Sequence, residues 1–207
     1  MLALSGTGAI KCEVLDEEGE VIKVAVVFHS ASGSTRQLAK AVAAGAVSVQ
    51  GVAVIQAEII GADISAGRFR NNLLLEQLDS AEAIVFGSPT YMGSVSAQFK
   101  AFADATSERW EQQLWANKIA AGFTIGSNVS GDQLHTLQYL QILANQHGML
   151  WAGLDIPGNH NAAGLNRLGA QSGVIAQSAD GLLHESDLLS ARYLGQRVAQ
   201  LSKRFAG

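Results

Sequence analysis

Hydroxyl-bearing residues crowd one short stretch of this 207-residue sequence, residues 30–35, which spells Ser-Ala-Ser-Gly-Ser-Thr. The stretch follows an apolar run at residues 21–28 and precedes apolar residues at helical spacing (Leu38, Ala41, Val42), so it joins a predicted strand to a predicted helix. Unpaired backbone N–H groups and the helix dipole favour an anion at a helix start, and hydroxyl groups add donors. The stretch therefore predicts a phosphate-binding loop, with an ordinary helix N-cap as the alternative.

Two widespread nucleotide-binding patterns are absent from this loop. A P-loop would end in Gly-Lys-Ser/Thr, and a dinucleotide-binding turn would carry three glycines in the spacing GxGxxG. Neither pattern occurs at residues 29–36. The loop therefore argues against an NTPase and against a Rossmann dehydrogenase.

The elements that must position this loop alternate between strands and helices, which is typical of a parallel sheet covered by helices on both faces. Ligands of such sheets bind beyond the carboxyl ends of the strands. The apolar runs predict five strands, at residues 21–28, 52–59, 83–87, 119–124 and 149–154. Further helices are expected near residues 72–78, 95–106, 131–146 and 187–205. Residues 155–185 are long for a structureless connection, and such loops usually serve a site or an interface.

The loop at residues 30–35 resembles the phosphate loop of flavodoxins: a hydroxyl residue, two positions, a glycine, one position and a threonine. The resemblance implies an α/β protein, a flavodoxin-like three-layer α/β/α sandwich with a five-stranded parallel sheet, that binds FMN. His29, directly before the loop, has no matching role in that family, and we expect a packed or solvated histidine. The residues implied to surround the phosphate are Ser30, Ser32, Gly33, Ser34 and Thr35.

The segment at residues 87–94, Gly-Ser-Pro-Thr-Tyr-Met-Gly-Ser, resembles the loop that contacts the flavin ring in WrbA-like NAD(P)H:quinone oxidoreductases. A flat isoalloxazine needs an apolar or aromatic face against it and backbone groups at its polar edge. For this segment alone, a turn carrying two core side chains is the alternative. The residues implied to bind the ring are Pro89, Thr90, Tyr91, Met92, Gly93 and Ser94.

After the fourth predicted strand, residues 125–128 occupy the place of the glycine-rich loop that runs along the flavin in the same group. Small residues there allow backbone donors to approach a ligand closely. Asn128 and Val129 depart from the family pattern, which is richer in Gly and Thr. The residues carried over are Ile125, Gly126, Ser127 and Asn128.

Two further segments are similar to this group. Residues 98–110 resemble a helix that ends in Asp-x-Thr and a tryptophan near the substrate, which implies that Trp110 covers the ring; packing on a neighbouring subunit is the alternative. Residues 145–149 resemble a His-Gly-Met segment, which implies that His147 reaches the flavin across a subunit interface; an interaction with the helix dipole is the alternative. Residues 166–173, 176–178 and 190–195 resemble the loop and last helix of the group.

The resemblance implies an FMN-dependent NAD(P)H:quinone oxidoreductase that uses NADH or NADPH and passes hydride through FMN to a quinone-type acceptor. The flavin performs the redox chemistry, so no certain catalytic side chain is expected. A flavodoxin-like single-electron carrier and a non-catalytic FMN-binding interaction protein are the alternatives. Carriers commonly have a strongly acidic surface around the flavin, so the modest net charge of −4 favours the reductase. A homo-oligomer, dimer or tetramer, is also implied.

Composition limits the remaining classes. A net charge of −4 leaves no basic footprint for nucleic acid. The single cysteine, Cys12, cannot form an intramolecular disulfide, and we expect no metal site and a cytoplasmic location. No apolar run reaches the roughly 18 to 20 residues that span a bilayer, so no membrane insertion is expected. We expect one domain over residues 21–207, after an extension or hairpin at residues 1–20.

Overall fold

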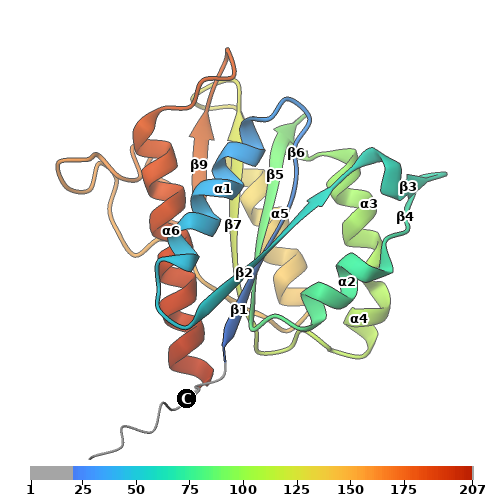
Figure 1. Ribbon diagram of the computed structural model, residues 1–207. Coiled ribbons are helices and arrows are strands. Elements are labelled where there is room, and N and C mark those ends of the chain that lie inside the picture. The colour runs from blue at the N-terminus through green and yellow to red at the C-terminus, as the bar shows by residue number, and fades with distance from the viewer. Residues whose placement is uncertain (1–20, 207) are drawn as a thin grey trace, which may run out of the picture.

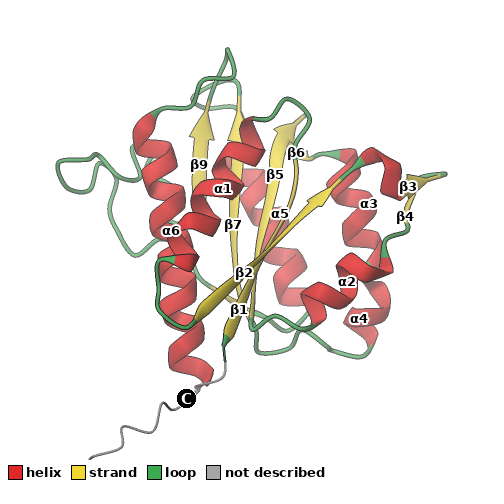
Figure 2. Ribbon diagram, viewed as in Figure 1, coloured by secondary structure: helices red, strands yellow, loops and turns green. Residues whose placement is uncertain are grey.

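A parallel sheet forms the middle layer of the protein, in a computed structural model that describes residues 21–206 (Figures 1 and 2). The strand order is β2-β1-β5-β7, and β7 pairs on its other side with both β8 and β9. The predicted α/β sandwich is confirmed, whereas the predicted extension at residues 1–20 lies outside the described residues. The strands are β1 (Ile22–His29), β2 (Val52–Ile59), β5 (Ala83–Tyr91), β7 (Ile119–Gly126), β8 (Leu150–Trp151) and β9 (Val174–Gln177).

Helices cover both faces of this sheet because its central strands are apolar on both sides. In β1, Val24 and Val26 face one core layer, while Ala25 and Val27 face the other. Alternation of side chains along a strand produces this division. The first layer holds α1 (Ser34–Val47) and α6 (Glu185–Ala206). The second layer holds α2 (Asn72–Asp79), α3 (Ala97–Ala105) and α5 (Gln133–Gln146).

Helices α1 and α6 pack with their backbones in close contact. A Cβ atom placed on Gly45 would collide with the carbonyl group of Arg192, and one placed on Gly195 would collide with the carbonyl group of Val42. Glycine at both positions therefore sets how closely α6 lies against α1. The contact lies in the last turns of α1, at the end of the helix away from the predicted phosphate loop.

The fifth strand differs from the prediction of one strand at residues 149–154. Strand β8 covers only Leu150–Trp151 beside Ile119 and Ala120, and β9 lies inside the predicted long connection, beside residues 123–126 of β7. After β8 the chain leaves the sheet, because the N–H of Leu154 bonds to the carbonyl of Gln171 instead of to β7. The apolar residues that predicted a longer strand, including Leu154, are buried in the core without extending the ladder.

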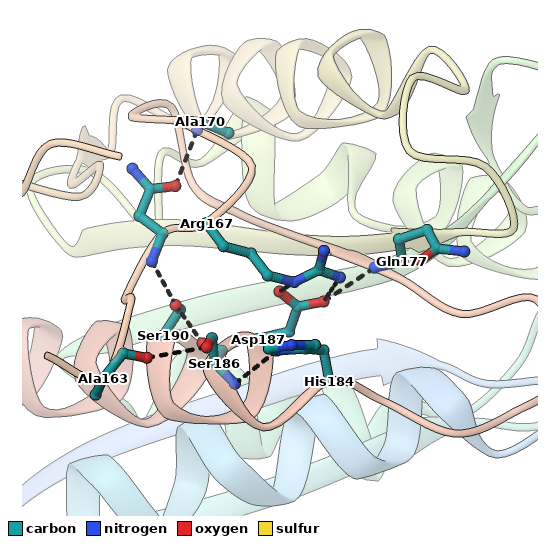
Figure 3. Close-up of polar contacts among 9 residues, drawn as sticks. Ala163, Arg167, Ala170, Gln177, His184, Ser186, Asp187 and Ser190 are labelled. Carbon is teal, nitrogen blue, oxygen red and sulfur yellow. Dashed lines mark hydrogen bonds and ion pairs between the residues drawn. The ribbon is translucent and has the colours of Figure 1, made fainter. Parts of the chain in front are cut away.

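The excursion between β8 and β9 is fixed to the start of α6 by a cluster of polar contacts (Figure 3). The Arg167 guanidinium forms two bonds of 2.8 Å with the carboxylate of Asp187, which is 1% exposed. The N–H of Gln177, at the end of β9, also donates to Asp187 at 3.2 Å. The N–H of Asn166 donates to Ser190 at 2.7 Å. These contacts hold β9 in place against β7 and α6.

Short elements that the sequence analysis did not anticipate lie between the main ones. They add a small hairpin after β2, a two-residue partner for the end of β5, and one helical turn after α3. They are η1 (Gly61–Asp63), β3 (Ile64–Ser65), β4 (Arg68–Phe69), β6 (Ser94–Val95) and α4 (Ser107–Glu111).

Candidate functional site

The loops that follow β1, β5 and β7 meet at one edge of the sheet. These strands are mutually parallel, so their carboxyl ends share that edge, at the top of Figure 1. Ligands of open α/β sheets bind in this position. The structure therefore brings together the three segments that the sequence analysis assigned to phosphate, ring and flavin edge.

The loop after β1 leads into a helix whose first turn contains no acidic side chain. The Ser30 hydroxyl accepts the N–H groups of Gly33 and Arg36, each at 3.2 Å, and Gly33 has a φ of 96°, which favours glycine. Helix α1 begins at Ser34 with no acidic residue in its first turn. Among the described residues, the N–H groups of Ser34 and Thr35 have no protein acceptor. A phosphate would meet only donors and the positive end of the helix dipole here, so the loop fits the phosphate of FMN.

The cation closest to this loop in sequence is already paired. Arg36 donates from Nε and Nη2 to the Glu58 carboxylate at 2.7 and 2.6 Å, and this pairing raises the pKa of the guanidinium. Ser32 is exposed, and its Oγ lies 3.4 Å from Oγ of Ser34. Neutral hydroxyl and N–H groups, rather than a free cation, therefore form the candidate phosphate site.

The segment assigned to the flavin ring is a tight hairpin between β5 and β6. Met92 and Gly93 have φ of 48° and 77°, which makes a two-residue turn with both central residues left-handed. Tyr91 is 46% exposed and Met92 is fully exposed, so the alternative of two core side chains is wrong. Pro89 is buried in the strand, whereas Gly93 and Ser94 are partly exposed at the turn.

A chain of hydroxyl groups supports this hairpin from below. Thr124 donates its only hydroxyl proton to the carbonyl of Ser88 at 2.7 Å, so it accepts from Thr90, 2.8 Å away. Thr90 in turn accepts from Thr136 at 2.8 Å, since its own proton is committed to Thr124. Of the ring residues, Thr90 is therefore a support that joins β5, β7 and α5.

The loop after β7 is shaped by a residue that the sequence analysis missed. The side chain of Gln133, 3% exposed, donates to the carbonyl of Asn128 at 2.5 Å and accepts the N–H of Gly131 at 2.7 Å. Ile125 is buried and Gly126 partly exposed, whereas Ser127 and Asn128 are exposed at the edge. A glutamine at a helix start carries no distinctive signal, so only the three-dimensional loop reveals this role.

A second missed residue, His135, holds the hairpin against α5. Its Nδ1 lies 2.6 Å from the carbonyl oxygen of Gly93. A carbonyl can only accept, so Nδ1 carries the proton. His135 and Gln133 both belong to the first turn of α5, so the hairpin and the loop after β7 are both fastened to this helix.

Two predicted site residues lie at the opposite edge of the sheet. Trp110 is in α4, next to Arg109, which pairs with Asp79 just before β5. His147 precedes β8 and is 1% exposed, with Nε2 at 2.9 Å from Oγ1 of Thr106. Burial lowers the pKa of His147 to about 4. Within one chain, the structure does not bring Trp110 or His147 to the flavin loops.

The fold and the loops at the carboxyl edge define a flavodoxin-like nucleotide-binding protein. Residues 22–156 match the model of the NADPH-dependent FMN reductase family, and the chain belongs to this family. It is similar to the WrbA-like flavodoxin of Agrobacterium tumefaciens, with a TM-score of 0.69, 37% identity, and coverage of 88% of this chain and 98% of that structure.

Two curated relatives carry different names. Flavodoxin FldP of Pseudomonas aeruginosa is 38% identical over 190 residues, which cover 88% of this chain and 97% of the relative. An NAD(P)H dehydrogenase (quinone) of Archaeoglobus fulgidus is 34% identical over 195 residues, which cover 88% of this chain and 98% of the relative. No helix within residues 21–206 is long and apolar enough to cross a membrane.

Proposed function

We propose that this chain is an FMN-dependent NAD(P)H:quinone oxidoreductase. One observation carries the proposal. The start of α1, which offers hydrogen-bond donors and no acidic side chain, lies at the same edge of the sheet as the hairpin with the exposed Tyr91 and Met92. The family match and the relatives named NAD(P)H dehydrogenase (quinone) support it. When bound, FMN would accept hydride from NADH or NADPH and deliver two electrons to a quinone-type acceptor.

The chain's own residues bind and orient the flavin in this proposal. Ser32, Ser34 and Thr35 offer hydroxyl and N–H donors to the phosphate, while Ser30 holds the loop in shape. Tyr91 and Met92 lie on the ring side, and the exposed Ser127 and Asn128 would approach the flavin edge. No acid–base side chain is required for hydride transfer, which agrees with the predominance of hydroxyl, apolar and backbone groups at this edge.

An electron carrier is the second candidate function, because the relative from Pseudomonas aeruginosa is named a flavodoxin. A carrier would bind FMN through the same loops and dock a redox protein over the exposed hairpin. The two candidates differ in whether a nicotinamide nucleotide reduces the bound flavin directly.

The proposal includes a homo-oligomer in the cytoplasm. Trp110 and Leu114 are 47% and 45% exposed near the amino edge of the sheet, and a neighbouring subunit would cover these apolar side chains. Trp110 could reach a neighbour's flavin from there, whereas His147 is almost fully buried within its own chain. The lone cysteine, Cys12, supports a reducing compartment. Sedimentation velocity of wild type and of Trp110→Lys would test the oligomer, and a monomeric wild type would refute it.

The function is tested with the purified full chain. Flavin absorbance would first establish FMN binding, and steady-state assays with NADH or NADPH and a benzoquinone would follow. We expect both FMN binding and quinone-dependent oxidation of the nicotinamide. Absence of FMN binding would refute the reductase and the carrier together. FMN binding without nicotinamide oxidation would refute the reductase and leave the carrier.

A further inference from the structure

His29, which the family resemblance left without a role, occupies the junction between two candidate flavin loops. It is the last residue of β1 and directly precedes Ser30 of the phosphate loop. The side chain is buried, with the residue 5% exposed, and its Nδ1 lies 2.8 Å from Oγ of Ser96. Ser96 is fully buried and follows Val95, the last residue of β6. One side-chain contact thus spans from the end of β1 to the end of the ring hairpin.

Ser96 is itself fixed by hydrogen bonds within the unit formed by β5, β6 and α3. Its Oγ accepts the N–H of Phe99 at 3.2 Å and so caps α3, while its own N–H donates to Oγ of Ser88 at 3.0 Å. Ser88 belongs to β5, so β5, β6 and α3 meet at Ser96. Among residues 21–206, the His29–Ser96 contact is the side-chain hydrogen bond that links residues 29–37 to this unit. Figure 1 shows the loop after β1 beside β6.

We propose that His29 is a positioning residue of the flavin site, whose hydrogen bond to Ser96 sets the spacing between the phosphate loop and the ring hairpin. This inference rests on the proposed binding of FMN. The phosphate and the ring are two ends of one ligand, so loops held at the matching distance bind both ends together, as linked sites do. Loosened spacing would weaken binding of the linked ligand and scarcely affect a ligand that engages only the ring side.

A charge role for His29 is a separate possibility that the environment disfavours. Burial lowers the pKa of His29, and the nearby Glu58 carboxylate opposes this only in part. The imidazole is therefore neutral at pH 7. It contributes a fixed hydrogen bond rather than a positive charge toward the phosphate.

The test compares two ligands on the same protein. Apo protein is titrated with FMN and with riboflavin, which lacks the phosphate, and Kd is measured by flavin fluorescence. His29→Leu removes the hydrogen bond at similar volume, and we expect the Kd for FMN to rise about five- to tenfold while that for riboflavin changes less than about twofold. His29→Asn can place an amide atom near the position of Nδ1, so we expect it to recover most of the FMN affinity.

The ratio of the two Kd values separates positioning from general destabilisation, because a lower folded fraction weakens both ligands equally. Ser48→Ala is a matched control: it removes a 2.7 Å side-chain hydrogen bond to Gly45 at the other end of α1, and the ratio should stay at the wild-type value. Should His29→Leu fail to fold, His29→Gln replaces it, since its amide corresponds to Nε2 and cannot reproduce Nδ1. An unchanged ratio in the folded variant would overturn the role of His29 alone. Failure of the wild type to bind FMN would instead overturn the proposed function.

Discussion

Acidification should destabilise the protein through His147, a buried histidine that can hold a proton on only one ring nitrogen. Thr106 donates its hydroxyl proton to the carbonyl of Ala103 at 2.7 Å, so it must accept from Nε2 of His147. Nδ1 then carries a lone pair, and it has no partner among the described residues. The ring also packs against Trp115, with 4.4 Å between the ring centroids. A second proton would create a charge without an acceptor in this apolar setting.

The size of the effect follows from the two pKa values of His147. Burial lowers the pKa in the folded state to about 4, from 6.5 in the unfolded chain. Between these values the unfolded chain binds the proton more readily than the folded chain, so stability falls as the pH falls through this window. The free energy of unfolding should drop by about 2 kcal/mol between pH 7 and pH 5 from this group, and by about 3 kcal/mol below pH 4.

Urea unfolding of apo protein at pH 7, 6 and 5 would measure this dependence in wild type and in His147→Gln. Glutamine does not titrate, and its amide can still donate to Thr106 from the position of Nε2. We expect the variant to lose about 2 kcal/mol less than wild type between pH 7 and pH 5. The control is His160→Gln, because His160 is partly exposed and makes no side-chain hydrogen bond among residues 21–206; this variant should retain the wild-type dependence. Equal pH dependence in wild type and His147→Gln would refute the reasoning.

Three further substitutions test the site and the packing. Ser32→Glu should raise the Kd for FMN at least about tenfold, since it places a carboxylate beside the phosphate, whereas Ser32→Gln should change it by no more than about threefold. Equal Kd values for the two variants in flavin titrations would reject the phosphate assignment. Gly195→Ala should destabilise the fold by about 3 kcal/mol in urea unfolding, because its Cβ would meet the α1 backbone, while Gly61→Ala, which faces open space, should change stability by less than about 0.5 kcal/mol. Arg167→Met should lower the free energy of unfolding by about 3 kcal/mol, because it leaves the buried Asp187 without its cation, and adding Asp187→Leu should restore much of that loss. An unchanged free energy of unfolding in the single variant would show that the ion pair is dispensable.

The first βα unit was predictable because its determinants are local. The apolar run before residue 29 has no polar position except Lys23, and hydroxyl residues with Gly33 follow at once. Each feature acts within a few residues: the run buries a strand, and the left-handed Gly33 starts the helix. The structure accordingly places β1 and α1 where the sequence analysis expected them, within one residue at the start of β1.

The fifth strand was not predictable from local pattern. Residues 149–154 are apolar enough for a strand, yet an apolar residue is equally suited to a core position outside the ladder. The choice depends on whether the chain stays beside β7, and the contact between Leu154 and Gln171, 17 positions further on, draws it away. Strand β9 then pairs with the part of β7 that β8 leaves open. The four residues Val174–Gln177 do not predict this pairing by themselves.

The two interpretations of the loop at residues 30–35, phosphate binding and helix capping, involve different atoms and are compatible. The Ser30 hydroxyl oxygen accepts the N–H groups of Gly33 and Arg36, so it satisfies an N–H of the first turn of α1 although Gly33 is the N-cap residue. Because those two donors are satisfied, the loop keeps its shape while the N–H groups of Ser34 and Thr35 stay free for an anion. In the proposed site, these hydrogen bonds would therefore support phosphate binding and not compete with it. In the proposal above, His29 acts on the spacing between loops as Ser30 acts within one loop. Each residue fixes backbone that a ligand would otherwise have to order on binding.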